Sequence, residues 1–416
     1  MKVVWLCNVI IQDIAEVIGV EHPNSGGWIK GMYNQIKEHP DIDLVILFPH
    51  ECSVSGRVGK HKYYGFPRDN HKTLFREILA MELPEIVHIY GTEFEHSLSM
   101  VDIAKDINII GNVVVYIQGL VSYISKHYYS HLPSSVIYGF TIRDLLKLDN
   151  VYFQRKKFYD RGKIEQEVLS KVHNVIGRTD WDKACANQIN SQLNYFECNE
   201  ILNEKYYTGK WQIERCEEYS LFISQGYYPI KGLHILIEAI VEVVKSFPKC
   251  KLYVAGFRND DARLIDKLKT SYYQKYINNL IQANNLKDKV IFLGSLNKDD
   301  MYERYLKSHI YISSSTIENS PNSVGEAMLL GMPVICSDVG GIKNMVRHNS
   351  SGYIYQSDAP YMLAYYIKKV FSSRTIARSL GTEASLIAAN THNKEYNANS
   401  LLTAYQRIIT NEDTHS

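Results

Sequence analysis

The feature of this sequence that most constrains its fold is a repeated alternation of short apolar runs with amphipathic stretches, such as residues 27–39. Continuous β-branched runs that alternate with helical patterns are typical of parallel sheets covered on both faces. The sequence therefore predicts an α/β fold with doubly wound sheets. The predicted strands are residues 2–9, 43–48, 85–91, 112–119 and 173–179 in the first half, and 218–226, 250–257, 289–296, 309–315, 333–340 and 351–356 in the second.

The length of the chain, 416 residues, exceeds what one hydrophobic core usually supports, so two domains are expected. We predict a first domain over residues 1–205, a linker over 206–217, which lacks a clean period, and a second domain over 218–395. In open α/β sheets, ligands bind outside the carboxyl ends of the strands. A ligand is therefore expected in the cleft between the two sheets.

Composition and charge narrow the function classes. The formal net charge of +1 implies no global attraction to nucleic acid. The seven cysteines are scattered without any C-x-x-C spacing, which argues against a zinc site and is typical of buried thiols in a reducing cytosol. No run approaches the roughly 18 apolar residues that a transmembrane helix needs, so we expect any membrane contact to be peripheral.

Residues 318–326, ENSPNSVGE, follow the predicted strand 309–315 and contain the start of a predicted helix. Ser320 can cap this helix, and Pro321 fits its first position, where no amide donor is needed. Gly331 can end the helix. The segment is therefore expected to be a loop at a strand's carboxyl end that leads directly into a helix.

Two carboxylates flank this helix start, Glu318 on the loop and Glu326 on the second turn. The backbone amides of residues 321–323 form an anion site at the helix N-terminus, for which a phosphate is the natural ligand. Carboxylates are good acceptors for hydroxyl groups, and a nucleotide sugar carries hydroxyls on both sides of its diphosphate. The alternative is that Glu326 only complements the helix dipole and that Glu318 is a solvated loop residue.

The stretch ENSPNSVGEAMLLGMPVICSDVGG, residues 318–341, resembles the E-x7-E donor segment of retaining GT-B glycosyltransferases, specifically glycosyltransferase family 4 (group 1). The resemblance covers the second half of the chain. It implies two Rossmann-like domains facing a deep cleft, the first binding the acceptor and the second the nucleotide sugar. It also implies that the C-terminal helix, residues 396–416, packs back on the first domain.

The activity implied by this resemblance is retaining transfer of a sugar from a UDP- or GDP-sugar to a sugar hydroxyl, without a metal or another cofactor. The expected acceptor is a saccharide or a lipid-linked saccharide in bacterial surface polysaccharide assembly, at the cytoplasmic face of the membrane. Glu326 would bind the ribose hydroxyls, and Glu318 a hydroxyl of the transferred sugar. The residues that would contact sugar and phosphate between them are Asn319, Ser320, Pro321, Asn322, Ser323 and Val324.

Residues 224–240 resemble the strand, loop and helix in which this family places a lysine before a glycine, facing the diphosphate. Lys231 fills that position and is expected to stabilise the leaving group. The family usually has an arginine five residues earlier, where this chain has Gly226. Arg258 could compensate, although a solvated loop arginine is the alternative.

The first half offers candidates for the acceptor side. Gly26 and Gly27 resemble the glycine pair that lets a helix N-terminus approach the donor phosphates or the acceptor. Glu93 and His96 lie past the end of the predicted strand 85–91, where acceptor contact is expected, although His96 has an ordinary helix-start role as its alternative. His88, inside that strand, is predicted to be a core histidine.

Gln118 stands at a strand end that often carries a histidine in this family. A glutamine cannot be a general base, so it could only orient hydroxyls or the sugar. Arg178 could hold donor phosphate or an anionic acceptor, and pairing with Asp180 or Asp182 is the alternative. In front-side substitution, as proposed for retaining GT-B enzymes, the leaving diphosphate takes the acceptor's proton, so the protein positions and stabilises charge. The candidate catalytic residues are Glu318, Lys231, Gln118 and His96.

Two other motifs are weaker. The pairs Asp41/Asp43 and Asp180/Asp182 match the D-x-D pattern of metal-dependent GT-A enzymes, but the E-x7-E segment outweighs them and metal independence is expected. Residues 55–62 resemble a P-loop but lack its first glycine and its Ser or Thr.

Residues 121–163 hold eight Lys or Arg against three Asp, a local balance of +5, with Tyr and Phe interleaved. This combination suits an anionic membrane or a lipid-diphosphate acceptor, and a solvated helical face is the alternative. Two further functions stay open. A GT-B-like nucleotide-sugar epimerase would act on the donor alone, and a non-catalytic nucleotide-sugar or glycan-binding protein would bind without turnover.

Overall fold

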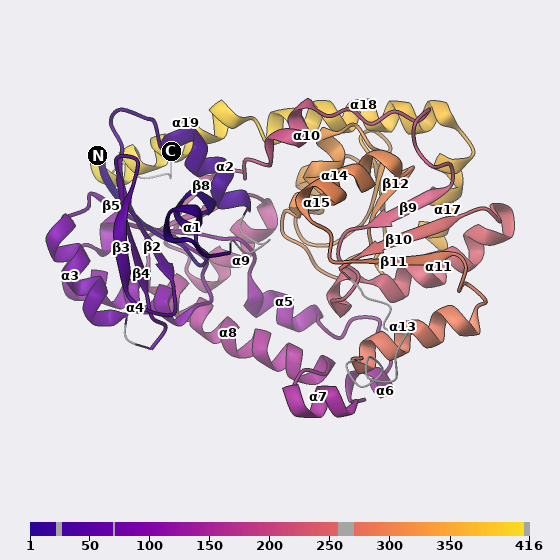
Figure 1. Ribbon diagram of the computed structural model, residues 1–416, viewed down its shortest axis with the longest axis horizontal. Helices are drawn as coiled ribbons and strands as arrows, with labels where there is room; N and C mark the ends of the chain where they lie inside the picture. The colour runs from indigo at the N-terminus through magenta and orange to yellow at the C-terminus, as the bar shows by residue number, and fades with distance from the viewer. Residues whose placement is uncertain (22–26, 70, 257–269, 412–416) are drawn as a thin grey trace. The chain divides into compact units, whose positions relative to one another are not determined.

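The apolar runs of the sequence form two separate β-sheets in the computed structural model, which describes residues 1–21, 27–69, 71–256 and 270–411 (Figure 1). The chain divides into two compact units. Unit 1 comprises Met1–Tyr123, Tyr159–Asn203 and His392–Ser416, and unit 2 comprises Ile124–Phe158 and Glu204–Thr391. The expected first domain ran without interruption to residue 205, so the assignment of residues 124–158 to unit 2 is a difference from the sequence-based prediction.

The sheet of unit 1 has eight strands in the order β3-β4-β2-β1-β5-β6-β7-β8. All neighbouring pairs are parallel except β3 with β4, which are antiparallel. The five strands predicted in this half are confirmed, whereas β3, β4 and β8 were not predicted. The strands are β1 (Lys2–Leu6), β2 (Asp43–Pro49), β3 (Val54–Val58), β4 (His61–Phe66), β5 (Ile86–Tyr90), β6 (Val113–Tyr116), β7 (Asn174–Gly177) and β8 (Asn194–Glu197).

Helices cover both faces of this sheet, as the continuous apolar strands require. Alternate residues of β1 enter different cores: Val3 and Trp5 pack in one, and Val4 and Leu6 in the other. The helices are α1 (Gln12–Ile18), α2 (Gly27–Ile36), α3 (Lys72–Glu82), α4 (Glu95–Asp106), α9 (Asp180–Ile189) and α19 (Lys394–Thr410). Helix α5 (Val121–His127) and the long α8 (Val151–Lys171) each belong partly to both units.

Helix α19 returns the end of the chain to unit 1, where Figure 1 shows it near α2. The Tyr405 hydroxyl lies in the core of this unit. It accepts a hydrogen bond from Trp5 Nε1 at 3.0 Å and lies 2.5 Å from His88 Nδ1. The family resemblance implied such packing for residues 396–416, of which 412–416 lie outside the described residues.

The sheet of unit 2 has six parallel strands in the order β11-β10-β9-β12-β13-β14, and all six were predicted. They are β9 (Ser220–Ile223), β10 (Lys251–Ala255), β11 (Val290–Gly294), β12 (Ile310–Ser313), β13 (Val334–Ser337) and β14 (Tyr353–Tyr355). The chain moves outward from β9 to β10 and β11, then crosses to β12 on the other side. The pair β9 and β12 is therefore the point where strand order reverses, and a ligand crevice is expected at their carboxyl ends.

The segment 124–158 contributes two short helices to unit 2, α6 (Ser134–Ile137) and α7 (Ile142–Lys147). The other helices of unit 2 are α10 (Glu204–Thr208), α11 (Leu233–Ser246), α13 (Tyr272–Ala283), α14 (Lys298–Lys307), α15 (Asn322–Leu329), α16 (Ile342–Met345), α17 (Pro360–Phe371) and α18 (Arg374–Thr391). No helix in the described part of the chain is long and apolar enough to cross a bilayer.

Candidate functional site

Lys231 follows β9 at the point where strand order reverses, in a short 3-10 turn (Pro229–Lys231). The next residue, Gly232, has φ +68, and a Cβ there would lie 1.9 Å from the carbonyl oxygen of Ser314. The Ser314 hydroxyl donates to the carbonyls of Lys231 and Gly232 at 3.0 and 3.1 Å. The lysine is therefore fixed against the end of β12, and glycine is required beside it.

Glu318 lies on the loop after β12, as predicted, and its backbone is enclosed by the glycine pair of residues 340–341. The amide of Gly341 donates to the Glu318 carbonyl at 3.1 Å. Gly340 has φ +50, and a Cβ there would lie 1.8 Å from the same oxygen. The Ser315 hydroxyl donates to Glu318 Oε1 at 2.7 Å. Backbone and side chain of this glutamate are therefore both held in place.

The side chains of Lys231 and Glu318 meet, with Nζ 2.5 Å from Oε1. They are 21% and 12% exposed, so the pair is mostly shielded from solvent. Both line a small pocket together with Ser224, Gln225 and Ser323. A cation and a carboxylate at one pocket can bind a phosphate and a hydroxyl of the same ligand.

Helix α15 begins one residue later than predicted, at Asn322, so Pro321 is the residue before the helix rather than its first position. The predicted capping role of Ser320 is wrong, because the residue in the cap position is Pro321 and no side chain caps the helix there; the Ser320 hydroxyl donates to the sulfur of Met345 at 3.5 Å. The predicted end is confirmed: Gly331 has φ +77, and its amide and that of Met332 close the helix onto Met328 and Ala327. The amides of the first turn lie at the helix N-terminus, where the anion site stays a prediction.

Glu326 lies on the second turn of α15, as predicted. The Tyr305 hydroxyl donates to its Oε2 at 3.1 Å and also lies 3.1 Å from the Ser323 carbonyl. Tyr206 hydrogen-bonds to the same carboxylate, and burial, reinforced by the Glu326 charge, raises the pKa of both phenols. These tyrosines stand on α10 and α14, and no local pattern in the sequence connects them to the site.

The family arginine that Gly226 replaces has no room in this chain. A Cβ at Gly226 would lie 2.2 Å from Cγ1 of Val254, and its amide bonds to the Ala255 carbonyl at 3.0 Å. The side-chain direction at this position is occupied by the Val254 side chain of β10, so a larger residue would require that side chain to move. Arg258, considered as a substitute cation, lies outside the described residues, as does Gly26.

The remaining candidates belong to unit 1. Gln118 follows β6, and its Oε1 lies 3.4 Å from Asn8 Nδ2. Arg178 is 6% exposed, donates to the Gln118 carbonyl and forms an ion pair with Glu200 at 2.7 Å. Sequence reasoning did not find Glu200. Asp182 accepts from the Arg178 backbone amide and closes a capping box at the start of α9.

His96 lies on the first turn of α4, its ring stacked on Phe94 and 5.5 Å from Phe66. Burial lowers the pKa of His96 to about 3, so its ring is neutral at physiological pH. Burial also raises the pKa of Glu93. His88 is fully buried, which confirms the core assignment. Roles of these residues toward an acceptor stay predictions.

Gly27 is the first residue of α2, and a Cβ there would meet nothing within 4 Å. Its place at a helix N-terminus agrees with the expected position, while no steric contact within the described residues demands a glycine. Within those residues, no group of three or more His, Cys, Asp or Glu could hold a metal ion. Metal independence therefore stays a prediction.

Replacing Gly340 with alanine is expected to displace the Glu318 backbone and weaken ligand binding at this site. A matched control is Gly331→Ala, which has φ +77 but a nearest contact of 3.5 Å for the added Cβ. Both variants should lose roughly 1–2 kcal/mol of stability from the positive φ alone. Only Gly340→Ala should lower the melting temperature further and weaken nucleotide-sugar binding in a calorimetric titration. Equal binding by the two variants would contradict this role for Gly340.

Comparison with known proteins shows which proteins this chain resembles. Residues 208–386 match the family described as Glycosyl transferases group 1. The Bacillus subtilis protein YtcC is 25% identical over 210 residues, covering 50% of this chain and 49% of YtcC. A phosphatidyl-myo-inositol mannosyltransferase of Mycobacterium tuberculosis is 27% identical over 145 residues, covering 35% and 34%. The chain thus spans about half the length, or less, of these curated relatives.

The structure of the Anabaena protein Alr3699/HepE, solved in complex with UDP and glucose, matches with a TM-score of 0.68 at 14% identity. It covers 98% of this chain and 99% of that one. At this identity the likeness shows the fold alone. The expected two-domain α/β GT-B-like fold is thereby confirmed, and the resemblance to group 1 glycosyltransferases is supported. Membership of family 4 and retention of configuration stay predictions.

Proposed function

We propose that this chain is a retaining glycosyltransferase of family 4 that transfers a sugar from a UDP- or GDP-sugar to a sugar hydroxyl. The observation that carries this proposal is the meeting of Lys231 and Glu318 at 2.5 Å where the strand order of the unit 2 sheet reverses, beside the N-terminus of α15. The match of residues 208–386 to group 1 glycosyltransferases and the fold shared with a UDP-binding protein support it.

In this proposal the donor diphosphate binds Lys231 and the amides of the first turn of α15. The ribose hydroxyls bind Glu326, which Tyr305 and Tyr206 orient, and a hydroxyl of the transferred sugar binds Glu318. The bond between the sugar's anomeric carbon and the diphosphate breaks as the acceptor oxygen bonds to that carbon from the same face. The acceptor's proton passes to the departing diphosphate oxygen, whose charge Lys231 stabilises.

The proposed acceptor is a saccharide or lipid-linked saccharide of bacterial surface polysaccharide assembly, used at the cytoplasmic face of the membrane. The name of the mycobacterial relative, a phosphatidyl-myo-inositol mannosyltransferase, supports a lipid-linked acceptor. Gly27, Glu93, His96, Gln118 and Arg178 are proposed for the acceptor side or the donor phosphates. Because His96 is neutral at physiological pH, its proposed contribution is positioning rather than proton transfer. No metal is assigned to the reaction.

The test is to screen UDP- and GDP-sugars by thermal shift and then follow the stabilising donor with lipid-linked saccharides. Proton NMR of the product is expected to show the anomeric configuration of the donor, and turnover should persist in EDTA. Inverted configuration or loss of activity in EDTA would overturn the retaining, metal-independent assignment. Conversion of the donor without an acceptor would identify an epimerase, and binding without turnover a non-catalytic protein.

A further inference from the structure

Helix α7 buries an acidic side chain and exposes its leucines, the reverse of what is expected of a short surface helix. Its acidic residue Asp144 is 1% exposed, whereas Leu146, two positions on, is 81% exposed. In soluble proteins such helices turn apolar side chains inward and charged ones outward. Neighbouring exposed residues extend this surface, here named the apolar tip: Tyr138, Phe140, Ile142, Leu145, Leu146 and Leu148.

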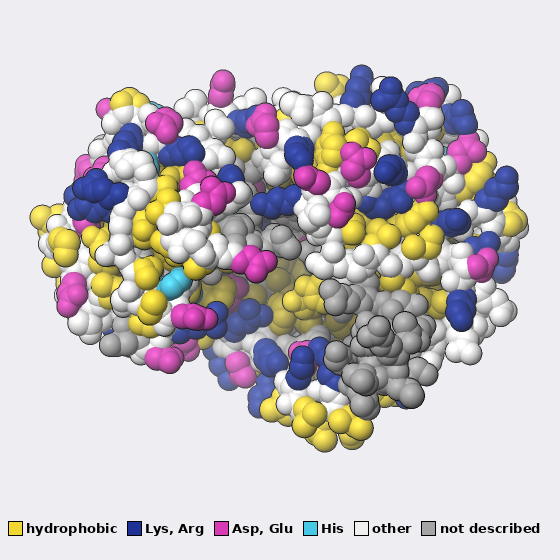
Figure 2. All heavy atoms as spheres, in the orientation of Figure 1, with side chains coloured by type: hydrophobic (Ala, Val, Ile, Leu, Met, Phe, Trp, Pro, Cys, Tyr) yellow, Lys and Arg dark blue, Asp and Glu magenta, His cyan; other side chains and the backbone are white. Residues whose placement is uncertain are grey.

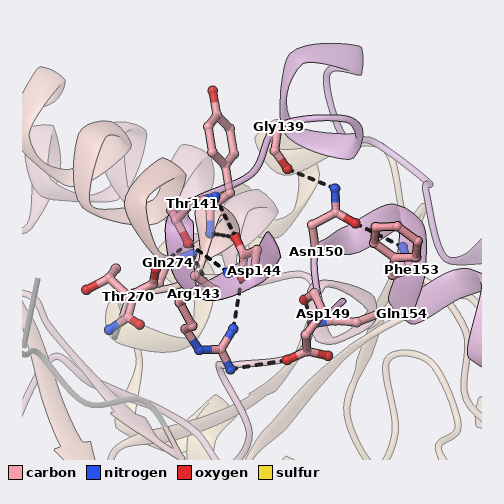
Figure 3. A network of polar contacts seen from close by, with 12 residues as sticks. Gly139, Thr141, Arg143, Asp144, Asp149, Asn150, Phe153, Gln154, Thr270 and Gln274 are labelled. Carbon is pink, nitrogen blue, oxygen red and sulfur yellow. Dashed lines mark hydrogen bonds and ion pairs between the residues drawn. The ribbon is translucent and has the colours of Figure 1, made fainter. Parts of the chain in front are cut away.

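The network of polar contacts in Figure 3 holds α7 in this orientation. Thr141 and Asp144 form a capping box at the start of α7. Asp144 also accepts the backbone amide of Tyr272 at 2.7 Å, and the Thr141 hydroxyl donates to the Thr270 carbonyl at 2.9 Å. The polar side of α7 is therefore attached to the N-terminal end of α13, which leaves the leucines facing outward.

Two further contacts hold this arrangement. Arg143 bridges Asp144 and Asp149 at 2.9 and 3.1 Å, and Asn150 links the Gly139 carbonyl to the start of α8. Burying the leucines without breaking this network requires another apolar surface to meet them. Contiguous exposed apolar surface of this kind marks an interaction site.

Basic side chains lie close to the apolar tip along the chain. Lys147 on α7 and Lys156 on α8 are exposed, and within the described residues no ion pair takes up either of them. Lys157 reaches Asp149 only at 3.7 Å. Figure 2 shows Lys and Arg gathered above hydrophobic side chains at the lower edge of the view. Arg155 also belongs to the basic stretch 121–163, but its side chain donates a hydrogen bond to the Ser125 carbonyl.

We propose that the apolar tip inserts into the headgroup region of a bilayer that contains anionic lipids. Leucines and aromatic residues beside unpaired lysines are the combination that interfacial binding requires, because the apolar groups enter the acyl boundary and the cations meet lipid phosphates. Tyr138 and Tyr152, whose rings lie 6.0 Å apart, add the aromatic character of interfacial segments.

The experiment is co-sedimentation of the full chain with vesicles of phosphatidylcholine and phosphatidylglycerol in equal parts, and with phosphatidylcholine alone. Binding is expected to the anionic vesicles and to be much weaker to the neutral ones. The double change Leu145→Ser and Leu146→Ser should weaken it by about ten- to a hundredfold. Changing Lys147→Gln and Lys156→Gln should cost about fivefold for each lysine and reduce the salt dependence.

The matched control is the double change Met81→Ser and Leu386→Ser, which removes exposed apolar residues from α3 and α18 and should leave binding unchanged. Melting temperatures report whether each variant folds. Failure of the wild-type chain to bind anionic vesicles would overturn the proposal, as would unchanged binding by the leucine variant. If sedimentation velocity shows a dimer of the wild-type chain and a monomer of the leucine variant, the tip would instead be an interface with a second copy. Donor turnover with a soluble acceptor is independent of these outcomes.

Discussion

Replacing Lys231 with methionine is expected to lower kcat by about a hundred- to a thousandfold, the size of effect seen when one preorganised charge-stabilising donor is removed from an active site. Methionine retains most of the side chain's length and apolar character but carries no charge. The effect should fall mainly on kcat, because the negative charge on the leaving diphosphate grows in the transition state. Initial-rate kinetics with saturating donor measure it directly.

The matched control for this change is Lys245→Met, on the exposed end of α11, where the lysine pairs only with Glu242 among the ion pairs of the described residues. Its kcat should equal that of the wild type. A Lys231→Met enzyme with unchanged kcat would remove the lysine from the reaction. Because Lys231 and Glu318 contact each other, adding Glu318→Gln to Lys231→Met should cost less than the sum of the two single changes.

Replacing Glu326 with alanine is expected to raise the Michaelis constant for the donor by about ten- to a hundredfold. A charge-assisted hydrogen bond contributes roughly 1.5–3 kcal/mol, and the ribose is remote from the breaking bond. The loss should therefore appear in donor binding, with a smaller change in kcat. Isothermal titration with the nucleoside diphosphate alone separates this effect from any effect on the acceptor.

The control for the Glu326 prediction is Glu303→Ala, on α14, whose carboxylate is 56% exposed and reaches Lys307 only at 3.7 Å. Tyr305→Phe is a second comparison, since it removes the hydroxyl that orients Glu326 but leaves the charge, and it should have a smaller effect. Equal donor affinity in the wild type and Glu326→Ala would defeat the assignment of the ribose to this carboxylate.

The strands of both units were largely predictable, for a reason that particular segments show. Strands β9 to β14 were all found because each carries an apolar run, and in β9, β12 and β13 every residue is buried, as in strands covered on both faces. The hairpin of β3 and β4 was not found, because β3 (Val54–Val58) is mostly exposed and carries no such run. Likewise β8 (Asn194–Glu197) has a single buried residue.

The assignment of residues 124–158 to unit 2 could not be predicted either. It rests on contacts such as Asp144 with the Tyr272 amide, whose partners lie 128 residues apart. The sequence showed the charge of this stretch but not which of its side chains are exposed. For example, Arg155 and Lys156 are adjacent basic residues, yet the first is bonded to the Ser125 carbonyl and the second faces solvent.

The sequence by itself determined the α/β class, the position of Glu318 at a strand end and that of Glu326 on the following helix, because apolar period and helix end signals are local properties. The tertiary structure alone brought Lys231 to Glu318 across 87 residues, and placed Tyr206 and Tyr305 against Glu326. It also paired Arg178 with Glu200 and turned the leucines of α7 outward. The physical reason is that strand order and helix packing decide which distant residues meet, and no short-range pattern encodes that order.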